Sequence, residues 1–301
     1  MGYLDGKVVA ITGAGRGIGR AVALDAAAAG AKILVADYGV GMAGEEPTSD
    51  VADAVVKEID QLGGEAIAVA GDVSDTAVGQ KIVDTCVESW GRIDGVVCVA
   101  GILRERMLFN MSDEEWDDVI RVHLRGTFSL FRPASAVMRK QGSGSLISFT
   151  SGVWALGSVA QANYAAAKAG IVTFTRSAAL GLNKYGVTAN VIAPVARTRM
   201  SANVPQDLAE MGDPEDVAPM VVYLLSDKAR HITGQVYTVV GGKIAVWCQP
   251  EEVRAMYTDG RWTPEEIEAH LDSTVGTEEM PLLAKIKEYE AAAAAKKATE
   301  G

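Results

Sequence analysis

Residues 8–19 read VVAITGAGRGIG, an apolar run that leads into closely spaced glycines, and an alanine-rich stretch follows. The segment predicts a buried strand, a tight turn and a helix. Gly13, Gly17 and Gly19 permit the turn and let the backbone approach a dinucleotide pyrophosphate, which would lie at the positive end of the helix. The spacing differs from the common G-x-G-x-x-G pattern, so a glycine turn without a ligand is the alternative.

Similar apolar runs alternate with helix-like stretches as far as residue 239. They are Val8–Ile11, Ile33–Ala36, Ala66–Ala70, Gly95–Val99, Ser145–Phe149, Thr188–Ile192 and Gln235–Val239. Strands that are apolar throughout are covered on both faces, as in a parallel sheet with crossover helices. The sequence therefore predicts a doubly wound α/β domain with helices on both faces.

The pattern changes after Gly242, so we expect one domain over residues 1–242 and an acidic, mainly helical extension over residues 243–301. The extension contains a capped helix start at Thr263-Pro264-Glu265-Glu266 and an Ala/Lys/Glu-rich helix from Leu282 to Lys297. It is either a solvated appendage or an element that docks over the active site or on a neighbouring subunit.

Composition excludes several classes of function. The net charge of −11 argues against nucleic acid as a partner, because a phosphate backbone attracts clustered cations. No apolar run is long enough for a membrane helix and no signal peptide is apparent, so we expect no membrane partner and a cytoplasmic location. The three cysteines and three histidines lack metal-ligand spacing, so no metal site is expected.

The second apolar run ends in Asp37, 18 residues after Gly19. A carboxylate here can accept both ribose hydroxyls of NAD and would repel the 2′-phosphate of NADP. Arg16 is evidence against this choice, since a cation in the glycine turn could receive that phosphate, but we give the carboxylate more weight. Asp72 follows the third run and either meets the adenine edge or caps the next helix, and both roles can coexist.

Ser151, Tyr164 and Lys168 form the candidate catalytic group. Tyr164 and Lys168 are four residues apart in a helix-compatible stretch, so phenol and ammonium share a face. A nearby cation favours phenolate, and we expect Lys168, together with oxidised nicotinamide, to lower the pKa of Tyr164 toward working pH. Tyr164 would exchange the proton while Ser151 holds the substrate oxygen.

These elements, in this order, resemble the short-chain dehydrogenase/reductase family over about residues 5 to 242. The motifs are the turn Thr12–Gly19, Asp37, Asp72, Ala100-Gly101, Ser151, Tyr164, Lys168, Asn190 and Pro194–Thr198. The resemblance implies a single Rossmann-type domain of about seven parallel strands, with dinucleotide binding and catalysis in residues 1–242, and a homotetramer or homodimer.

The cofactor-binding residues that the sequence and the resemblance together suggest are Gly13, Arg16, Gly17, Ile18, Gly19, Asp37, Asp72, Val73, Ala100, Gly101, Tyr164, Lys168, Ile192, Pro194 and Thr198. Within this set, the resemblance places Ile192 and Thr198 against the nicotinamide carboxamide.

The chain departs from the family pattern at three places. Cys98-Val99 replaces the usual Asn-Asn before Ala100, and we expect Cys98 to be a packing residue. Val195 replaces the usual glycine after Pro194. His123 stands where the family has a helical asparagine that completes a proton relay with Ser, Tyr and Lys, so it is either an altered relay member or a buried structural histidine.

The segments around Gly101–Arg106, Val122–Gly126 and Gln161–Tyr164, with the glycine-rich insertion Gly39–Ser49, resemble a particular branch of the family. It contains the 17β-hydroxysteroid dehydrogenase type 4 and (3R)-hydroxyacyl-CoA dehydrogenase domains. The resemblance implies NAD-dependent oxidation of a bulky secondary alcohol, either a 3-hydroxyacyl-CoA or a steroid-like or terpenoid alcohol.

Two other functions remain open at this point. One is an NADPH-dependent 3-oxoacyl-carrier-protein reductase, against which Asp37 argues. The other is a non-catalytic NAD-binding partner subunit, against which the intact catalytic group argues. Four arginines are candidates for CoA phosphates, with surface ion pairs as the alternative: Arg104, Arg106, Arg197 and Arg199.

Overall fold

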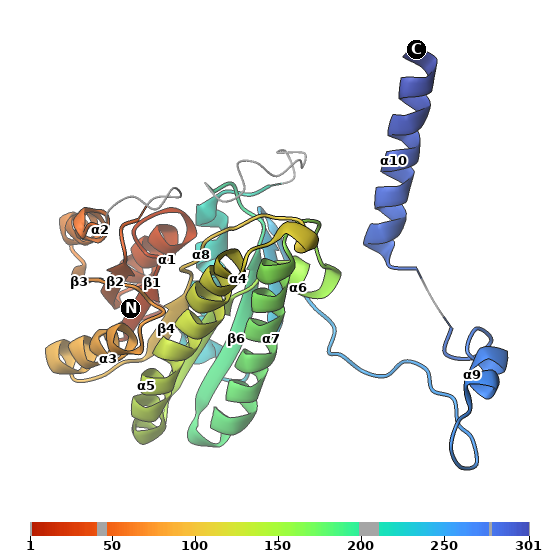
Figure 1. Ribbon diagram of the computed structural model, residues 1–301. Coiled ribbons are helices and arrows are strands. Elements are labelled where there is room, and N and C mark those ends of the chain that lie inside the picture. Colours follow the sequence, from red (N-terminus) through yellow and green to blue (C-terminus); the bar gives the residue numbers. More distant parts are fainter. Residues whose placement is uncertain (1, 41–46, 199–210, 277–278, 301) are drawn as a thin grey trace. The chain divides into compact units, whose positions relative to one another are not determined.

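A computed structural model describes residues 2–40, 47–198, 211–276 and 279–300. Within these residues, eight strands form one sheet in the order β3-β2-β1-β4-β5-β6-β7-β8 (Figure 1). The strands are β1 Val8–Thr12, β2 Lys32–Asp37, β3 Glu65–Ala70, β4 Gly95–Cys98, β5 Gly144–Phe149, β6 Val187–Pro194, β7 Val236–Val240 and β8 Lys243–Val246. Strands β1 to β7 pair in parallel. The predicted doubly wound α/β fold is confirmed.

Strand β8 was not predicted, because we assigned residues 243–246 to the extension. It pairs antiparallel with β7, and Gly241 and Gly242 make the turn between them. Gly241 has φ +50°, a left-handed conformation that suits glycine in a two-residue hairpin. The Gly-Gly pair between two apolar runs was therefore a hairpin signal that our sequence interpretation took as the end of the domain.

Helices cover both faces of the sheet. They are α1 Gly17–Ala28, α2 Asp50–Gln61, α3 Thr76–Trp90, α4 Asp113–Ile120, α5 Gly126–Gln141, α6 Val153–Leu156, α7 Ala162–Leu182 and α8 Pro214–Leu225. Helices α1, α2 and α8 enclose one apolar core with the sheet, and α3, α5 and α7 enclose the other. Neighbouring residues of a strand serve opposite cores: in β5, Leu146 belongs to one and Ile147 to the other. This double burial explains why the strands read as continuous apolar runs.

The sheet reverses its direction of winding at β1, which has β2 on one side and β4 on the other. At such a switch point the loops that follow the two strands diverge and leave a crevice at the carboxyl ends of the strands, where ligands of open α/β sheets bind. The ends of β1 to β6 carry most of the candidate residues, and α7 and the turn Arg121–Arg125 carry the others.

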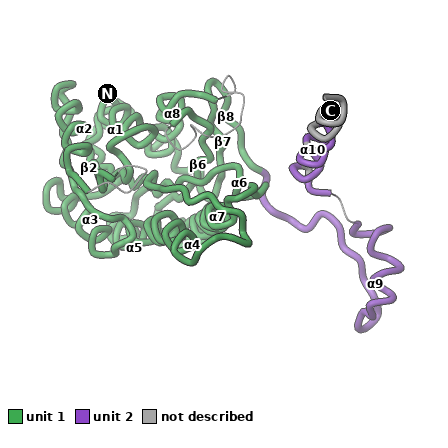
Figure 2. The backbone as a smooth tube through the Cα atoms, turned by 45° about the horizontal axis from the view of Figure 1, so that its top comes forward, with its two compact units in different colours: residues 1–247 green, residues 248–301 purple. Residues whose placement is uncertain are grey.

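The chain divides after Trp247 into two units, residues 1–247 and 248–301 (Figure 2). The second unit contains α9 Pro264–His270 and α10 Pro281–Glu300. The predicted helix start is confirmed, because Thr263 caps α9 in a reciprocal capping box with Glu266. None of the helices in the described residues has the length and apolar character needed to cross a membrane.

Candidate active site

The glycine turn between β1 and α1 has no room for a side chain at Gly13 or Gly19. A Cβ on Gly13 would lie 2.7 Å from the backbone nitrogen of Ala100, and a Cβ on Gly19 would lie 2.1 Å from the carbonyl oxygen of Gly13. Gly13 and Gly17 also have positive φ, +66° and +52°. These glycines shape a close backbone approach that fits a pyrophosphate group.

The start of α1 provides the electrostatic part of this fit. Arg16 precedes the helix in an extended conformation, and the first turn contains no acidic residue, so the positive end of the helix is not neutralised from within. Arg16 is exposed, whereas Ile18 is half-buried against the apolar core. Thr198, in the loop after β6, lies 3.8 Å from the position of a Cβ on Gly17.

Asp37 closes β2 beside the glycine turn. Its Oδ2 accepts a hydrogen bond of 2.9 Å from the backbone nitrogen of Gly15, and its Oδ1 accepts one of 2.8 Å from that of Gly39. The carboxylate therefore holds a fixed orientation between the phosphate turn and the start of the glycine-rich insertion, residues 41–46 of which lie outside the described residues. Each oxygen has a further lone pair available for a ribose hydroxyl.

Asp72 does not cap α3, which corrects one of the two roles that we considered for it. The N-cap is Asp75, whose side chain accepts from the backbone nitrogen of Ala77. Asp72 instead accepts hydrogen bonds from Ser74 and, at 2.6 Å, from Arg121. Partial burial raises the pKa of Asp72, but these hydrogen bonds outweigh it and hold the pKa below its usual value. Val73, the other candidate here, is buried.

The end of β4 brings three predicted positions together. Cys98 is buried, and burial raises the pKa of its thiol to about 12, so it packs in its protonated form. Ala100 lies against Gly13, and Gly101 lies against His123, since a Cβ on Gly101 would be 2.2 Å from Cε1 of the imidazole. The loop after β4 is thereby held between the glycine turn and His123.

His123 is buried in η2, a π-helical turn over Arg121–Arg125. Its Nε2 lies 2.7 Å from the carbonyl oxygen and 3.1 Å from the backbone nitrogen of Ile102. Its Nδ1 is buried and has no hydrogen-bond partner among the described residues. Burial, reinforced by the charge of Lys168, holds the pKa of His123 well below its usual value, so the imidazole is neutral.

Ser151, Tyr164 and Lys168 meet at the carboxyl end of β5. Ser151 follows the strand, and its hydroxyl lies near enough to the phenol of Tyr164, at the start of α7, to favour ionisation of that phenol. Lys168 lies one turn further along α7, with Nζ 5.3 Å from the centre of the Tyr164 ring. Nζ donates a hydrogen bond of 2.8 Å to the carbonyl oxygen of Phe149, the last residue of β5.

Burial sets the protonation states of this pair. It raises the pKa of Tyr164 to about 12, although the hydroxyl of Ser151 opposes the shift, and it lowers the pKa of Lys168 to about 7. We expected Lys168 and oxidised nicotinamide together to lower the pKa of Tyr164. In the protein alone the direction is opposite, because desolvation of the phenolate dominates.

Asn163 is a positioning residue that the sequence interpretation missed. It is fully buried, and its Nδ2 donates to the carbonyl oxygens of Arg104 and Glu115, at 3.0 and 2.8 Å. Its Oδ1 accepts from the backbone nitrogen of Tyr164 at 2.7 Å. One amide thus ties the loop after β4, helix α4 and the first turn of α7 together, next to the reactive phenol.

The strand β6 places Ile192 in the core and ends at Pro194. The loop after Thr198 lies largely outside the described residues, and so does Arg199. The other three arginines considered for CoA phosphates are in ion pairs: Arg104 with Asp118, Arg106 with Glu115 and Arg197 with Asp213. Phosphate binding by any of them would compete with these carboxylates.

Comparison with known proteins gives matches over most of the chain. A family model described as Enoyl-(Acyl carrier protein) reductase matches residues 13–243. Hydroxyacyl-CoA dehydrogenase ChsB1 of Mycobacterium tuberculosis is 44% identical over 284 residues, which are 89% of this chain and 88% of that protein. Peroxisomal multifunctional enzyme type 2 of Mus musculus is 42% identical over 241 residues, 80% of this chain and 32% of the longer mouse protein.

A solved structure agrees with these matches. The crystal structure of a short chain dehydrogenase from Mycobacterium avium superposes with a TM-score of 0.83 at 43% identity, and the match covers 92% of this chain and 97% of that one. The resemblance inferred from the motifs is thereby confirmed.

The depressed pKa of Lys168 predicts a pH-dependent stability difference. Below pH 7 Lys168 is a buried ammonium in the folded protein, and its desolvation lowers the free energy of unfolding. This destabilisation disappears as the pH rises from about 7 to about 10.5, where the unfolded state also deprotonates. Lys168→Met should therefore be more stable than the wild type at pH 6, by a few kcal/mol at most, since each pKa unit is worth about 1.4 kcal/mol.

This difference should shrink as the pH approaches 10, which urea titrations at several pH values would measure. Lys184→Met, at an exposed lysine, is the matched control and should change little. A difference between wild type and Lys168→Met that stays constant with pH would contradict the burial argument.

Proposed function

Because the chain belongs to the short-chain dehydrogenase/reductase family, we propose that it is an NAD-dependent dehydrogenase that interconverts a bulky secondary alcohol and its ketone. The favoured substrate is a 3-hydroxyacyl-CoA thioester, with a steroid-like or terpenoid alcohol as the other candidate. The observation that carries the proposal is the meeting of Ser151, Tyr164 and buried Lys168 at the strand ends where the glycine turn also lies, with the Lys168 Nζ 5.3 Å from the Tyr164 ring. The relative named hydroxyacyl-CoA dehydrogenase ChsB1 supports the substrate class.

Tyr164 exchanges the proton in this proposal. Its phenol is protonated in the protein alone, the state suited to donating a proton to a ketone oxygen as that oxygen becomes a hydroxyl. In the opposite direction the phenolate accepts the hydroxyl proton, and the charged form of Lys168, 5.3 Å from the ring, stabilises that phenolate. Ser151 donates a hydrogen bond to the substrate oxygen and fixes its position. When bound, NAD supplies the ring carbon that takes up the hydride.

The preference for NAD rests on Asp37. Its carboxylate is held by the backbone nitrogens of Gly15 and Gly39, beside the turn that fits the pyrophosphate, so a 2′-phosphate would meet a fixed negative charge. The alternative of an NADPH-dependent acyl-carrier-protein reductase requires a cation there instead. Arg16 is the described cation of the glycine turn, and it is exposed.

Replacement of the phenol tests the proposed chemistry. Tyr164→Phe removes the group that accepts the hydroxyl proton and should lower kcat for 3-hydroxybutyryl-CoA oxidation by NAD at least about 100-fold, measured by NADH absorbance, while NAD binding persists. Tyr185→Phe, in the 3-10 turn Asn183–Tyr185 that follows α7, is the matched control. Full activity in Tyr164→Phe would refute the mechanism. NAD binding by the wild type without turnover of any alcohol or ketone would support the non-catalytic partner subunit.

Replacement of the carboxylate tests the cofactor preference. In Asp37→Ala the ratio of kcat/KM with NAD to kcat/KM with NADP should fall at least about tenfold, because the repulsion of the 2′-phosphate and the ribose hydrogen bonds are both lost. Asp50→Ala, at an exposed carboxylate that begins α2, should leave the ratio unchanged. A wild type that prefers NADPH would overturn the NAD assignment and favour the reductase.

We propose that His123 is a positioning residue. Its ring meets that of Tyr164 edge to face, with centroids 5.2 Å apart, while Nε2 holds the backbone of Ile102. A neutral imidazole that excludes water from the phenol helps to keep the pKa of Tyr164 high.

His123→Ala should admit water, and the ionisation of Tyr164 would then move to lower pH, along with the pH profile of kcat. His123→Gln, which keeps bulk and a hydrogen-bonding group, should restore much of the wild-type profile. A loss of stability without movement of the profile would show that His123 only packs.

A further inference from the structure

Five large apolar side chains are exposed on one part of the first unit, and we call them the apolar rim. They are Met107 (42% exposed), Leu108 (68%), Phe109 (78%), Leu156 (47%) and Val159 (58%). Met107 to Phe109 lead into and form the short 3-10 helix η1, Leu108–Asn110, in the loop after β4. Leu156 ends α6, and Val159 follows in the loop that leads to α7. Contiguous exposed apolar surface of this kind usually marks a binding site.

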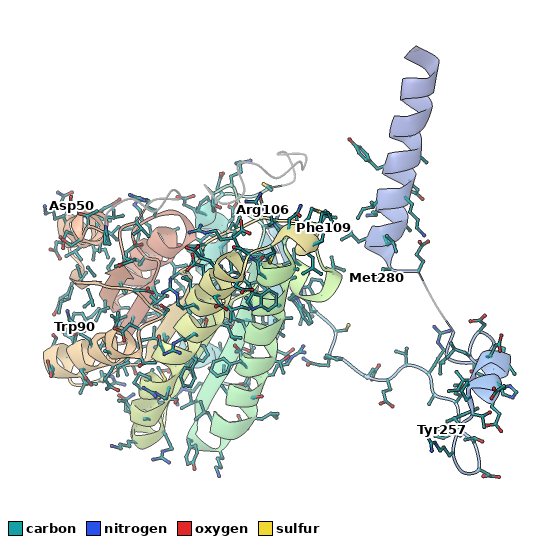
Figure 3. The ribbon with its side chains drawn as sticks, in the orientation of Figure 1. Asp50, Trp90, Arg106, Phe109, Tyr257 and Met280 are labelled. Carbon is teal, nitrogen blue, oxygen red and sulfur yellow. The ribbon has the colours of Figure 1, made fainter. Side chains whose placement is uncertain are left out.

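The two segments of the rim are bonded to each other. The backbone nitrogen of Arg106 donates to the carbonyl oxygen of Ala160 at 2.8 Å, and Gln161 donates to the carboxylate of Glu105 at 2.5 Å. Figure 3 shows Arg106 and Phe109 close together on the first of these segments. The rim is therefore one surface, although its members are up to 52 residues apart in the sequence.

One segment of the rim adjoins the catalytic group along the chain. Leu156 lies five residues after Ser151, and Ala160 lies four residues before Tyr164. Ala160 has φ +59°, a left-handed conformation that costs free energy in a non-glycine residue and persists where the surroundings impose it. Here the hydrogen bond from Arg106 joins this strained residue to the other segment, so the loop before Tyr164 is held in place.

The cation and the amide donor beside the rim are both engaged by carboxylates. Arg106 forms an ion pair with Glu115, and Glu105 accepts from Gln161. An uncharged, apolar ligand therefore matches this surface better than an anion. The CoA phosphates would have to bind elsewhere.

We propose that the apolar rim binds the alkyl chain or ring system of the substrate, beyond the carbon that Ser151 and Tyr164 act on. The inference rests on the proposed function and adds a substrate class to it: a hydroxyacyl group long or bulky enough to reach Phe109. Continuity with the catalytic group favours this occupant over a second copy of the chain, which would need only an exposed face.

The test compares two substrates, 3-hydroxybutyryl-CoA and 3-hydroxydodecanoyl-CoA, the latter kept below its micellar concentration. Phe109→Ser and Leu108→Ser should each lower the ratio of kcat/KM for the long substrate to that for the short one by about tenfold, because only the long chain reaches these side chains. Leu180→Ser, at an 85% exposed leucine of α7 outside the rim, is the matched control and should leave the ratio as in the wild type.

Calorimetric measurement of the binding of the same two thioesters tests the proposed role of the apolar rim independently of turnover. Weaker binding of the long thioester alone, in both rim variants, would support the inference, and equal losses for both thioesters or none would overturn it. A ratio that is unchanged while the sedimentation coefficient falls would overturn it too and identify the rim as a contact between copies. Absence of turnover in a wild type that still prefers the long thioester in binding would count against the proposed function alone.

Discussion

The candidate site depends on the near contact between the backbones of Gly13 and Ala100. A Cβ at Gly13 would lie 2.7 Å from the Ala100 nitrogen, so the end of β4 can approach the glycine turn only because position 13 has no side chain. The next residue, Gly101, meets the His123 ring in the same way, and that ring meets Tyr164 edge to face. A series of close contacts thus runs from the turn where a pyrophosphate fits to the phenol that exchanges a proton.

The chemistry of the site follows from burial. Lys168 is buried and Tyr164 is half-buried, and desolvation favours the neutral form of each, which moves their pKa values in opposite directions. The pKa values of such a pair shift strongly when a positive charge is brought next to it, because little water is present to screen that charge. Asn163 fixes the position of Tyr164 by accepting a hydrogen bond from its backbone nitrogen. The carbonyl oxygen of Phe149 fixes the ammonium of Lys168.

Much of the fold could be predicted from the sequence, because strands covered on both faces are apolar throughout and glycine turns are conspicuous. The placement of Ser151 and Asp37 at one edge of the sheet also followed, since each comes at the end of a predicted strand and parallel strands end at the same edge. Three features could not be predicted. The π-turn at His123 is a backbone state without a compositional signal, the buried bonds of Asn163 depend on which loops meet, and the pKa direction of Tyr164 depends on burial. The hairpin of β8 had a signal, Gly241-Gly242, that we interpreted otherwise.

The π-turn over Arg121–Arg125 lies between α4 and α5 without a break in helical backbone. A π-turn accommodates one residue more than an α-turn, and one residue of an α-helix corresponds to a rotation of about 100°. The face that α4 presents to Asn163 and the face that α5 presents to the core are therefore set out of phase by this single extra residue. In mutational terms, the segment tolerates exchange of side chains more readily than a change of length, because removing one residue would turn one of the two helices away from its contacts.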